Sequence, residues 1–594
     1  MIVSSETHAN ITRARTYAHW PPSQHRTPFR NLRDALALHA KASGSKPFLI
    51  SYDAANQRQE LTFAEFVARC HQVANLLFDD LGVRRGDRVA VIAHNAPEVV
   101  LIYMACWIVG AAVVPQNVSE DDQRIGFILR NSEAKLLFVQ QPYMARAQHI
   151  LQQTTTNIQG VIQIGGEAAD GALLFEEIVR SRSTTFLGDE SGAKSGDLSI
   201  RSANEHTPQL DDEALIVYTS GTTGAPKGVV LSQYNLIVDA QAIAQWHAIT
   251  GNQRLMCVLP LHHVNGIVVT LITPLLVGGS VVLNQRFTVH HFWERVTREK
   301  VQIVSVVPTL LQYLLDYARD NVQRGETIFG HGINRPNLAA FRHFICGAGT
   351  LSVRLASEFE DVIGFPIVHG YGLSETTCYS CFLPVMQSWE THQRWLREHG
   401  YPSIGCPIDV NEMAIFSADG SGQLLGPGQR GEICVRGHNV MLAYYQREDA
   451  NAEAFKFGWF RTGDEGFYLE GDDGRPYFFI TGRIKELINR GGVKFSPFEI
   501  EEVALSAPGV KLALAVGFEN DYYGEEVGLY VVPEEGAEPD AEAILAHCRA
   551  VLRFDKSPKA VVFGQDVPVT STGKYQRLRL RDLFSQFRGV QFRP

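Results

Sequence analysis

The sequence predicts an α/β protein with a large N-terminal domain of several subdomains, built on mixed and parallel sheets, and a small, mobile α+β C-terminal domain. Three observations support this. The 594 residues exceed the size at which one hydrophobic core keeps growing. Helical patterns alternate with short apolar runs from about Thr27 to Phe287 and again from Val301. Beyond Asp464 short strands and turns prevail, so we place the domains at residues 1–483 and 484–594.

Short apolar runs between helical patterns mark the expected strands of the large domain. They are Arg88–Ile92, Leu136–Val139, Val161–Ile164, Ile303–Val307, Phe344–Cys346 and Pro366–Val368. The stretch Gly165–Asp212 is rich in Gly, Ser and Asp and predicts a loose connector. Trp389–His399 is charged with helical spacing, which indicates a surface helix.

Clear turn and capping signals lie on both sides of the expected domain boundary. Asp472-Asp473-Gly474 lies between two apolar runs and predicts a β-hairpin. Ser496 is placed as the N-cap of a helix, with Pro497 at its first position and Glu499 placed for a capping box. Strands at Leu512–Val516 and Gly528–Val532 and a helix at Ala541–Leu552 follow.

Composition excludes several classes of function. The net charge is −10 with both signs interspersed, and no basic block favours nucleic acid or an anionic membrane. Two apolar stretches, Val99–Val114 and Gly266–Leu283, are interrupted by Gly or Pro and fit buried helix–strand units better than transmembrane spans. The first residues show no secretory pattern, and nine cysteines without paired spacing indicate a reducing compartment, so we expect a cytoplasmic protein.

The strongest local signal is the segment Tyr218-Thr-Ser-Gly-Thr-Thr-Gly-Ala-Pro-Lys-Gly228. An apolar strand at Ala214–Val217 runs into a loop of glycines and hydroxyls that ends with Lys227. Glycines let backbone amides approach phosphate oxygens, while hydroxyls and the lysine add hydrogen bonds and charge. Pro226 stands where a Walker A loop needs glycine, which disfavours a phosphate-loop motor or kinase.

Six further motifs follow in order: Pro260-Leu-His-His-Val-Asn-Gly266, Cys346-Gly-Ala-Gly-Thr-Leu351, Gly370-Tyr-Gly-Leu-Ser-Glu375, Gly458-Trp-Phe-Arg-Thr-Gly-Asp464, Thr481-Gly-Arg-Ile-Lys-Glu486 and Ser571-Thr-Gly-Lys-Tyr-Gln-Arg577. With the first loop, they resemble the motif set of the adenylate-forming superfamily of acyl- and aryl-CoA synthetases, peptide-synthetase adenylation domains and luciferases. The resemblance covers about Leu32 to Leu580 and is closest to acyl- or aryl-CoA ligases.

The resemblance implies a nucleotide site with magnesium. Tyr371 would stack on adenine, Asp464 would accept the ribose hydroxyls, and Arg483 would add a ribose or phosphate contact. Glu375 and Thr219 would bind Mg²⁺, which takes few protein oxygens beside waters and phosphates. The remaining nucleotide-binding positions would be Ser220, Gly221, Thr222, Thr223, Gly224, Lys227, Gly347, Ala348, Gly370, Gly372 and Ser374.

Roles in the reaction also follow from the resemblance. Lys574 would reach the carboxylate and the α-phosphate and stabilise the charge that develops there, making it catalytic together with Glu375. His263, the third expected catalytic residue, would line the carboxylate pocket. Lys485 would be the hinge about which the small domain rotates, and Gly491 and Gly492 would line the tunnel for the thiol.

These features predict ATP-dependent activation of an organic carboxylate to acyl-AMP, with release of pyrophosphate and transfer to coenzyme A. The alternative acceptor is the pantetheine of an acyl carrier protein, an amine or another nucleophile. A luciferase-type oxygenase or a non-catalytic scaffold would share the fold, but the retained set of site residues argues against the scaffold. No acidic residue stands in Pro260–Gly266, which disfavours an α-amino acid, and Gly372 indicates room for a longer or aromatic acid.

Overall fold

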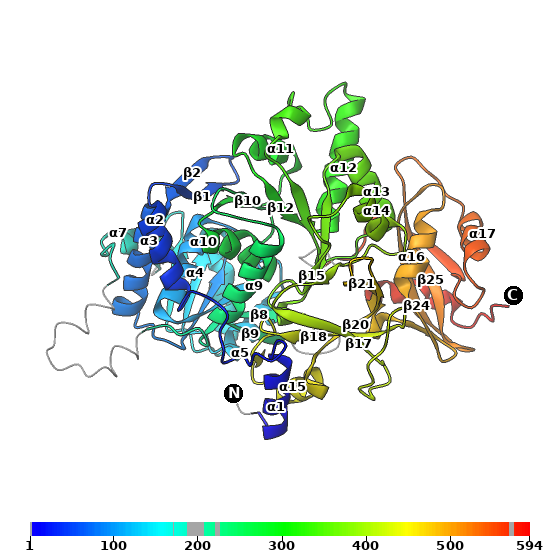
Figure 1. The fold of residues 1–594 in the computed structure, drawn as a ribbon, viewed down its shortest axis with the longest axis horizontal. Coiled ribbons are helices and arrows are strands. Elements are labelled where there is room, and N and C mark those ends of the chain that lie inside the picture. Colours follow the sequence, from blue (N-terminus) through cyan, green and yellow to red (C-terminus); the bar gives the residue numbers. More distant parts are fainter. Residues whose placement is uncertain (1–2, 170–171, 187–206, 220–225, 570–574, 594) are drawn as a thin grey trace.

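The computed structural model describes residues 3–169, 172–186, 207–219, 226–569 and 575–593. It shows a large N-terminal part, coloured blue to yellow in Figure 1, beside a small C-terminal part in orange and red. The α/β class expected from the alternating pattern is therefore confirmed.

The first large sheet has the strand order β19-β9-β8-β4-β3-β5-β6-β7. Pairing is parallel from β8 through β7, whereas β9 pairs antiparallel with both β8 and β19. Its strands are β3 (Arg88–Ile92), β4 (Ala112–Gln116), β5 (Leu136–Gln140), β6 (Gly160–Ile164), β7 (Leu173–Leu174), β8 (Glu213–Thr219), β9 (Lys227–Ser232) and β19 (Ala443–Tyr444).

The second large sheet has the order β16-β15-β14-β13-β12-β10-β11-β1-β2 and is parallel from β14 to β1. Its strands are β1 (Pro47–Tyr52), β2 (Arg58–Thr62), β10 (Arg254–Cys257), β11 (Ser280–Asn284), β12 (Ile303–Val306), β13 (His343–Cys346), β14 (Ile367–Tyr371), β15 (Cys381–Phe382) and β16 (Cys406–Pro407). The strands expected in both halves of the large domain are thus present.

Helices cover these sheets and form the buried core with them. They are α1 (Ser5–Ala14), α2 (Leu32–Ser43), α3 (Phe63–Asn75), α4 (Pro97–Val109), α5 (Asp122–Asn131), α6 (Met144–Gln153), α7 (Phe175–Arg180), α9 (Gln233–Trp246), α10 (Thr273–Val277), α11 (Val289–Arg298), α12 (Pro308–Gln323), α13 (Val353–Ile363), α14 (Trp389–Arg397) and α15 (Glu448–Ala454). Helices α16 (Pro497–Leu505) and α17 (Ala541–Val551) pack instead against the C-terminal sheet described below.

Both apolar stretches that resemble membrane spans are buried helix–strand units. Helix α4 is buried almost throughout and ends at Gly110, whose φ of 86° permits the left-handed C-cap before β4. The second stretch forms a π-helix (Asn265–Ile272), then α10, and reaches β11 after Gly278. Among the described residues, no helix has the length and apolar character needed to cross a membrane.

The stretch Gly165–Asp212 corrects one expectation. We predicted a loose connector, but its described part contains β7 and the short helix α7, which buries Phe175 and Val179. Two apolar positions four residues apart are enough to anchor one helical turn on a core, although the surrounding composition is typical of a loop. The surface helix expected at Trp389–His399 is α14, and it stacks Trp395 on Tyr477.

A third sheet and the C-terminal sheet complete the fold. The third has the order β17-β18-β20-β21, with β17 (Asn411–Phe416), β18 (Gly431–Gly437), β20 (Phe460–Glu470) and β21 (Pro476–Arg483). The hairpin expected at Asp472–Gly474 joins β20 to β21. The C-terminal sheet has the order β23-β22-β25-β24, with β26 parallel to β25. Its strands are β22 (Ile488–Arg490), β23 (Val493–Phe495), β24 (Val510–Asn520), β25 (Gly524–Pro533) and β26 (Ala560–Phe563).

Helix α16 begins at the N-cap that the sequence indicates, but the expected capping box is not formed, because the Glu499 carboxylate pairs with Lys556 at 2.7 Å. The helix docks the small sheet onto the large part. The Ser496 side chain accepts the Glu499 N–H, with Pro497 in the first turn. Across the interface, Glu502 accepts the N–H of Val353, the first residue of α13, at 3.1 Å. Arg354 donates to the carbonyl oxygens of Leu505 and Val510 at 2.8 and 2.7 Å. Main-chain and charged contacts therefore hold the two parts together.

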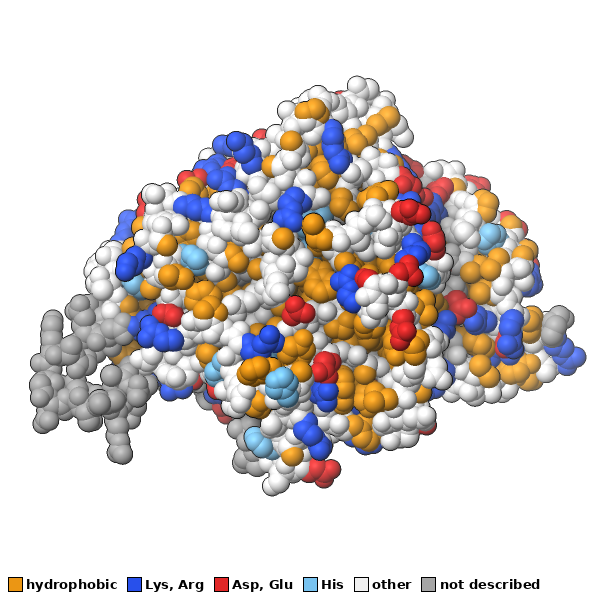
Figure 2. Space-filling view, in the orientation of Figure 1, with side chains coloured by type: hydrophobic (Ala, Val, Ile, Leu, Met, Phe, Trp, Pro, Cys, Tyr) orange, Lys and Arg blue, Asp and Glu red, His pale blue; other side chains and the backbone are white. Residues whose placement is uncertain are grey.

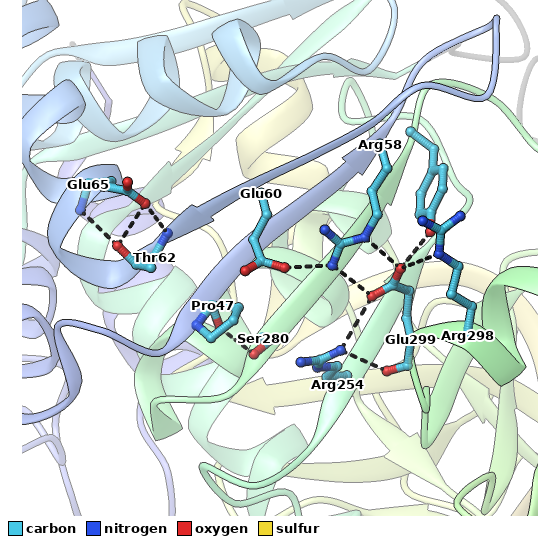
Figure 3. Close-up of polar contacts among 10 residues, drawn as sticks. Pro47, Arg58, Glu60, Thr62, Glu65, Arg254, Ser280, Arg298 and Glu299 are labelled. Carbon is cyan, nitrogen blue, oxygen red and sulfur yellow. Dashed lines mark hydrogen bonds and ion pairs between the residues drawn. The ribbon is translucent and has the colours of Figure 1, made fainter.

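A buried carboxylate fixes the edge hairpin β1–β2 to the second sheet. Glu299 has a side chain only 2% exposed, and it accepts a hydrogen bond from Arg58 Nε at 2.8 Å (Figure 3). It also accepts one from Tyr52 Oη at 2.5 Å. Arg254 and Arg298 also face it (Figure 3). Burial alone would raise the pKa of Glu299, but the hydrogen bonds from Arg58 and Tyr52 prevail and lower it.

Surface charge and cysteine state agree with the composition. The face in Figure 2 shows acidic and basic side chains mixed, as expected for a chain with interspersed charges. All nine cysteines are free and buried. Cys378 and Cys381 are both buried in the hydrophobic core.

Candidate active site

Asp464 is the centre of the first half of the site. It lies on β20, is 3% exposed, and accepts a hydrogen bond from Tyr371 Oη at 2.6 Å. Opposite it on β21, Arg483 places Nε 3.5 Å from Asp464 Oδ1. The negative charge of Asp464 is the main cause of the raised pKa of Arg483. The structure thus brings together Tyr371 and Asp464, which are 93 positions apart in the sequence, with Arg483.

Glu375 is the centre of the second half. It belongs to a 3₁₀ turn (Ser374–Thr376) that follows β14, and its carbonyl oxygen accepts the Met441 N–H at 2.8 Å. Its carboxylate oxygen Oε1 accepts the Tyr444 hydroxyl at 2.9 Å. Lys227 Nζ lies 4.6 Å from the centre of the Tyr444 ring. Burial lowers the pKa of Lys227, and the nearby Glu375 opposes this shift.

The glycine- and hydroxyl-rich loop is anchored by two paired strands. Thr219 ends β8, and Lys227, which begins β9, is its antiparallel partner. Both are half-buried. The predicted nucleotide-binding residues between them, Ser220, Gly221, Thr222, Thr223 and Gly224, lie outside the described residues. The strand pairing shows that the two ends of this loop meet beside Tyr444.

Gly347 and Ala348, two of the predicted nucleotide-binding residues, form a wall of close backbone contacts. A side-chain carbon at Gly347 would lie 2.6 Å from the Tyr379 hydroxyl and 2.8 Å from the Gly370 carbonyl oxygen, so only glycine fits. Ala348 follows with a φ of 64°. Gly370 and Tyr371 end β14, which pairs with β13 and so lies next to this wall.

Gly372 corrects an inference about the acid. A Cβ there would lie 2.0 Å from the Cys378 carbonyl oxygen and 2.6 Å from Tyr379 Cα. Close backbone packing therefore requires glycine at this position, whatever acid is bound. The missing side chain is not a measure of the depth of an acyl pocket. Ser374, two residues on, is half-buried at the start of the turn that carries Glu375.

His263 lies on the turn that precedes the π-helix Asn265–Ile272. The backbone N–H of His263 donates to the Pro260 carbonyl oxygen at 3.2 Å. Its ring is half-buried, and the ring centre lies 4.3 Å from that of His262. Burial lowers the pKa of His262 to about 4, so that neighbour is neutral at physiological pH. The role of His263 in the carboxylate pocket remains a prediction.

The structure describes three of the four predicted site residues in the C-terminal domain. Lys485 is exposed in the turn Ile484–Glu486 after β21, and its charge is near enough to lower the pKa of Lys227. Gly491 and Gly492 form the exposed turn between β22 and β23, with left-handed φ values of 58° and 88°. Lys574 lies outside the described residues. The hinge and tunnel roles stay predictions.

Sequence reasoning missed Tyr444 and Asn451. Asn451 is 1% exposed, and its side chain bonds both the N–H and the carbonyl oxygen of Tyr444, at 2.8 and 3.0 Å. Neither residue belongs to a motif that we identified. The one available signal was the tyrosine pair Tyr444-Tyr445 shortly before a helix start.

The donor set fits magnesium. Glu375 offers a carboxylate and Thr219 a hydroxyl, both hard oxygen donors of the kind that Mg²⁺ prefers. Lys227 adds positive charge for phosphate beside them. Within the described residues, no group of three or more His, Cys, Asp or Glu side chains is placed to hold a metal ion. A sparse protein ligand set is typical of Mg²⁺ bound together with nucleotide phosphates.

Comparisons with known proteins agree with this geometry. The family model described as AMP-binding enzyme matches residues 36–445, and the AMP-binding enzyme C-terminal domain matches residues 499–574. A probable CoA ligase from Humulus lupulus is 34% identical, covering 87% of this chain and 90% of that protein. An oxalate–CoA ligase from Arabidopsis thaliana is 32% identical, covering 87% and 92%.

A solved structure shares the fold over nearly the whole chain. It is the O-succinylbenzoate coenzyme A synthetase from Bacillus subtilis in complex with ATP and magnesium ion, with a TM-score of 0.72 and 27% identity over 91% of this chain and 98% of that one. Family model, relatives and fold lead to the same conclusion. The chain belongs to the AMP-binding enzyme family.

Proposed function

We propose that this protein is an AMP-forming acid–thiol ligase that joins a small organic carboxylic acid to coenzyme A. The observation that carries the proposal is the convergence of Tyr371, Asp464 and Arg483 next to the turn that holds Glu375. A buried carboxylate facing one arginine and one tyrosine is suited to hold a ribose, with its hydroxyl groups donating to Asp464.

The reaction has two half-reactions. In the first, a carboxylate oxygen attacks the α-phosphorus of ATP, the bond from that phosphorus to the bridging oxygen breaks, and pyrophosphate leaves. In the second, the thiolate sulfur of coenzyme A attacks the acyl carbon, and AMP leaves with the electron pair of the broken C–O bond. Activation is required because carboxylate oxygen is a poor leaving group and AMP is a good one.

The residues of the chain position and screen these reactants. Asp464 and Arg483 orient the ribose, and the Gly347–Ala348 wall gives adenine a close backbone surface beside Tyr371. Glu375 and Thr219 would hold Mg²⁺, which when bound neutralises phosphate charge. Lys227 contributes charge at the phosphate loop. Lys574 is proposed to approach the carboxylate and the α-phosphate, which otherwise repel each other.

Coenzyme A is the proposed acceptor because relatives across most of the chain are named as CoA ligases. A carrier-protein pantetheine or an amine remains the second candidate, since the residues for adenylation would be the same. An α-amino acid is disfavoured because Pro260–Gly266 holds no acidic side chain to pair with an ammonium group. Nine free buried cysteines support a reducing compartment, and we propose the cytoplasm.

A panel of fatty, aryl and dicarboxylic acids tests the proposal. Each acid is incubated with the full chain, ATP and Mg²⁺, and exchange of labelled pyrophosphate into ATP is followed with and without coenzyme A. Acid-dependent exchange, with a thioester found by mass spectrometry when coenzyme A is present, is the expected result. Exchange without thioester would favour the second acceptor class. No exchange with any acid would refute adenylation.

A further inference from the structure

We propose that Tyr444 is a positioning residue for the metal-binding carboxylate of Glu375, and that Asn451 fixes Tyr444 for this purpose. The inference rests on the proposed function, because it requires Glu375 to bind Mg²⁺ with ATP. Tyr444 touches neither nucleotide nor metal in the proposed role. It acts through the orientation of Glu375.

The contact between Tyr444 and Glu375 is direct and buried. The Tyr444 hydroxyl donates to Glu375 Oε1 at 2.9 Å, and the two side chains are 5% and 8% exposed. A carboxylate on a short turn can rotate about its side-chain bonds, and a hydrogen bond to one oxygen restricts that rotation. With Oε1 held by Tyr444, the second oxygen is directed for metal binding. Partners of this kind commonly tune the affinity of metal ligands.

The backbone of Tyr444 is itself held from two sides. Strand β19 pairs with β9, which places Tyr444 opposite Val229 near the end of the phosphate loop. On the other side, the Asn451 side chain of α15 accepts the N–H of Tyr444 and donates to its carbonyl oxygen. Asn451 is 1% exposed, and its two hydrogen bonds account for its burial. The hydroxyl therefore reaches Glu375 from a fixed base.

Helix α15 is in turn tied to the N-terminal helix. Glu448, the first residue of α15, accepts hydrogen bonds from Ser4 N–H at 3.1 Å and Thr7 Oγ1 at 2.8 Å. Helices α1 and α15 lie side by side at the lower edge of the molecule (Figure 1). Residues before the family match, which begins at residue 36, thus brace the helix that holds Tyr444.

The same strand supplies a matched control. Tyr445 is equally buried, at 5%, but its hydroxyl donates to Glu133 Oε2 at 2.7 Å, away from Glu375. Tyr444→Phe and Tyr445→Phe each remove one hydroxyl and keep the ring. The ring at position 444 also keeps its contact with Lys227 in the variant. Only the first substitution removes a bond to Glu375.

The test measures the affinity of the full chain for ATP by calorimetry at a series of fixed free Mg²⁺ concentrations. Tyr444→Phe should raise the Mg²⁺ concentration at half-maximal ATP affinity by about 10-fold, since loss of such a partner commonly weakens metal binding by that amount or more. ATP affinity without Mg²⁺ should not change, and excess Mg²⁺ should restore the affinity of the parent. Tyr445→Phe should match the parent throughout.

An unshifted Mg²⁺ dependence in Tyr444→Phe, or an equal shift in both variants, would overturn the inference. Thermal unfolding confirms that each variant is folded. If Tyr444→Phe does not fold, Asn451→Ala takes its place, with a smaller shift in the same direction expected and no shift contradicting the role. A parent that binds no ATP at any Mg²⁺ concentration would instead refute the proposed function, so the two failures are distinguishable.

Discussion

Arg483 faces Asp464 across the β20–β21 hairpin, with Nε 3.5 Å from Oδ1. Arg483 is also the last residue of β21, directly before the turn that holds Lys485. The residue proposed to contact the nucleotide is therefore adjacent to the proposed hinge. Binding of a ribose at Asp464 and rotation of the small domain would act on the same short segment.

The charge of Asp464 should be needed for nucleotide binding. Asp464→Asn keeps an acceptor for Tyr371 but removes the charge that faces Arg483 and the ribose hydroxyls. Hydrogen bonds to a charged group contribute about 1.5–3 kcal/mol, so ATP affinity by calorimetry should fall about 10- to 100-fold. Glu470→Gln, at the exposed end of the same strand, is the control and should bind ATP normally. Unchanged affinity in Asp464→Asn would exclude this role.

Glu502 should make stability depend on pH. Burial at the interface with α13 raises its pKa to about 8. The folded protein then binds a proton that the unfolded chain loses near pH 4.5, so the contribution of Glu502 to stability is greatest below that pH and is lost as the pH rises to about 8. Unfolding of the parent and of Glu502→Gln is compared between pH 5 and 9.

The free energy of unfolding of the parent, relative to Glu502→Gln, should fall over this range by on the order of 2 kcal/mol, since one pKa unit corresponds to about 1.4 kcal/mol and the side chain is not fully buried. Parallel pH profiles for the two proteins would show that Glu502 titrates normally.

The Glu299 cluster should stabilise the fold without serving the reaction. Glu299→Leu leaves Arg58 and Tyr52 without their shared acceptor in a buried setting. We expect a loss of about 2–4 kcal/mol in the free energy of unfolding, below the full effect of a buried pair because the arginines keep some solvent contact. Glu60→Gln removes only a partly exposed partner of Arg58 and should cost less than about 1 kcal/mol. If denaturant titrations showed the same loss of unfolding free energy in Glu299→Leu and Glu60→Gln, the stabilising role of Glu299 would be contradicted.

Gly372 should tolerate no side chain. Gly372→Ala forces a methyl group to within 2.0 Å of the Cys378 carbonyl oxygen, so the turn that leads to Glu375 must shift. Overpacking of this kind costs about 1–3 kcal/mol, and pyrophosphate exchange should fall with stability. The matched control is Gly426→Ala, whose added Cβ would lie 3.6 Å from its nearest neighbouring atom, so this variant should behave as the parent. A fully active, stable Gly372→Ala would show that the backbone approach is not required.

Local patterns were sufficient for much of the fold. Strand β3 has the bounds expected for it, and α17 ends one residue before its expected limit, because runs of apolar residues between turn signals determine such elements locally. Helix α7 was missed because its burial depends on a core that its own loop-like composition does not reveal. Whether such a segment forms a helix depends on its packing against residues distant in the sequence.

The candidate site was likewise predicted only in part from the sequence. Tyr371, Asp464, Arg483 and Glu375 were found from motifs, and the structure brings the first three into contact. Tyr444 was not found, because its role depends on the pairing of β19 with β9 and on a clamp from Asn451. Gly372 was found but misinterpreted, since only the structure shows how closely Cys378 approaches.

The central claim is that a carboxylate oxygen attacks the α-phosphorus of ATP at this site. The most direct measurement uses an acid from the panel labelled with ¹⁸O in both carboxyl oxygens, with ATP, Mg²⁺ and coenzyme A, and analyses the products by mass spectrometry. The account predicts one ¹⁸O atom in AMP and none in pyrophosphate. Label in pyrophosphate or in inorganic phosphate, with unlabelled nucleotide, would contradict it.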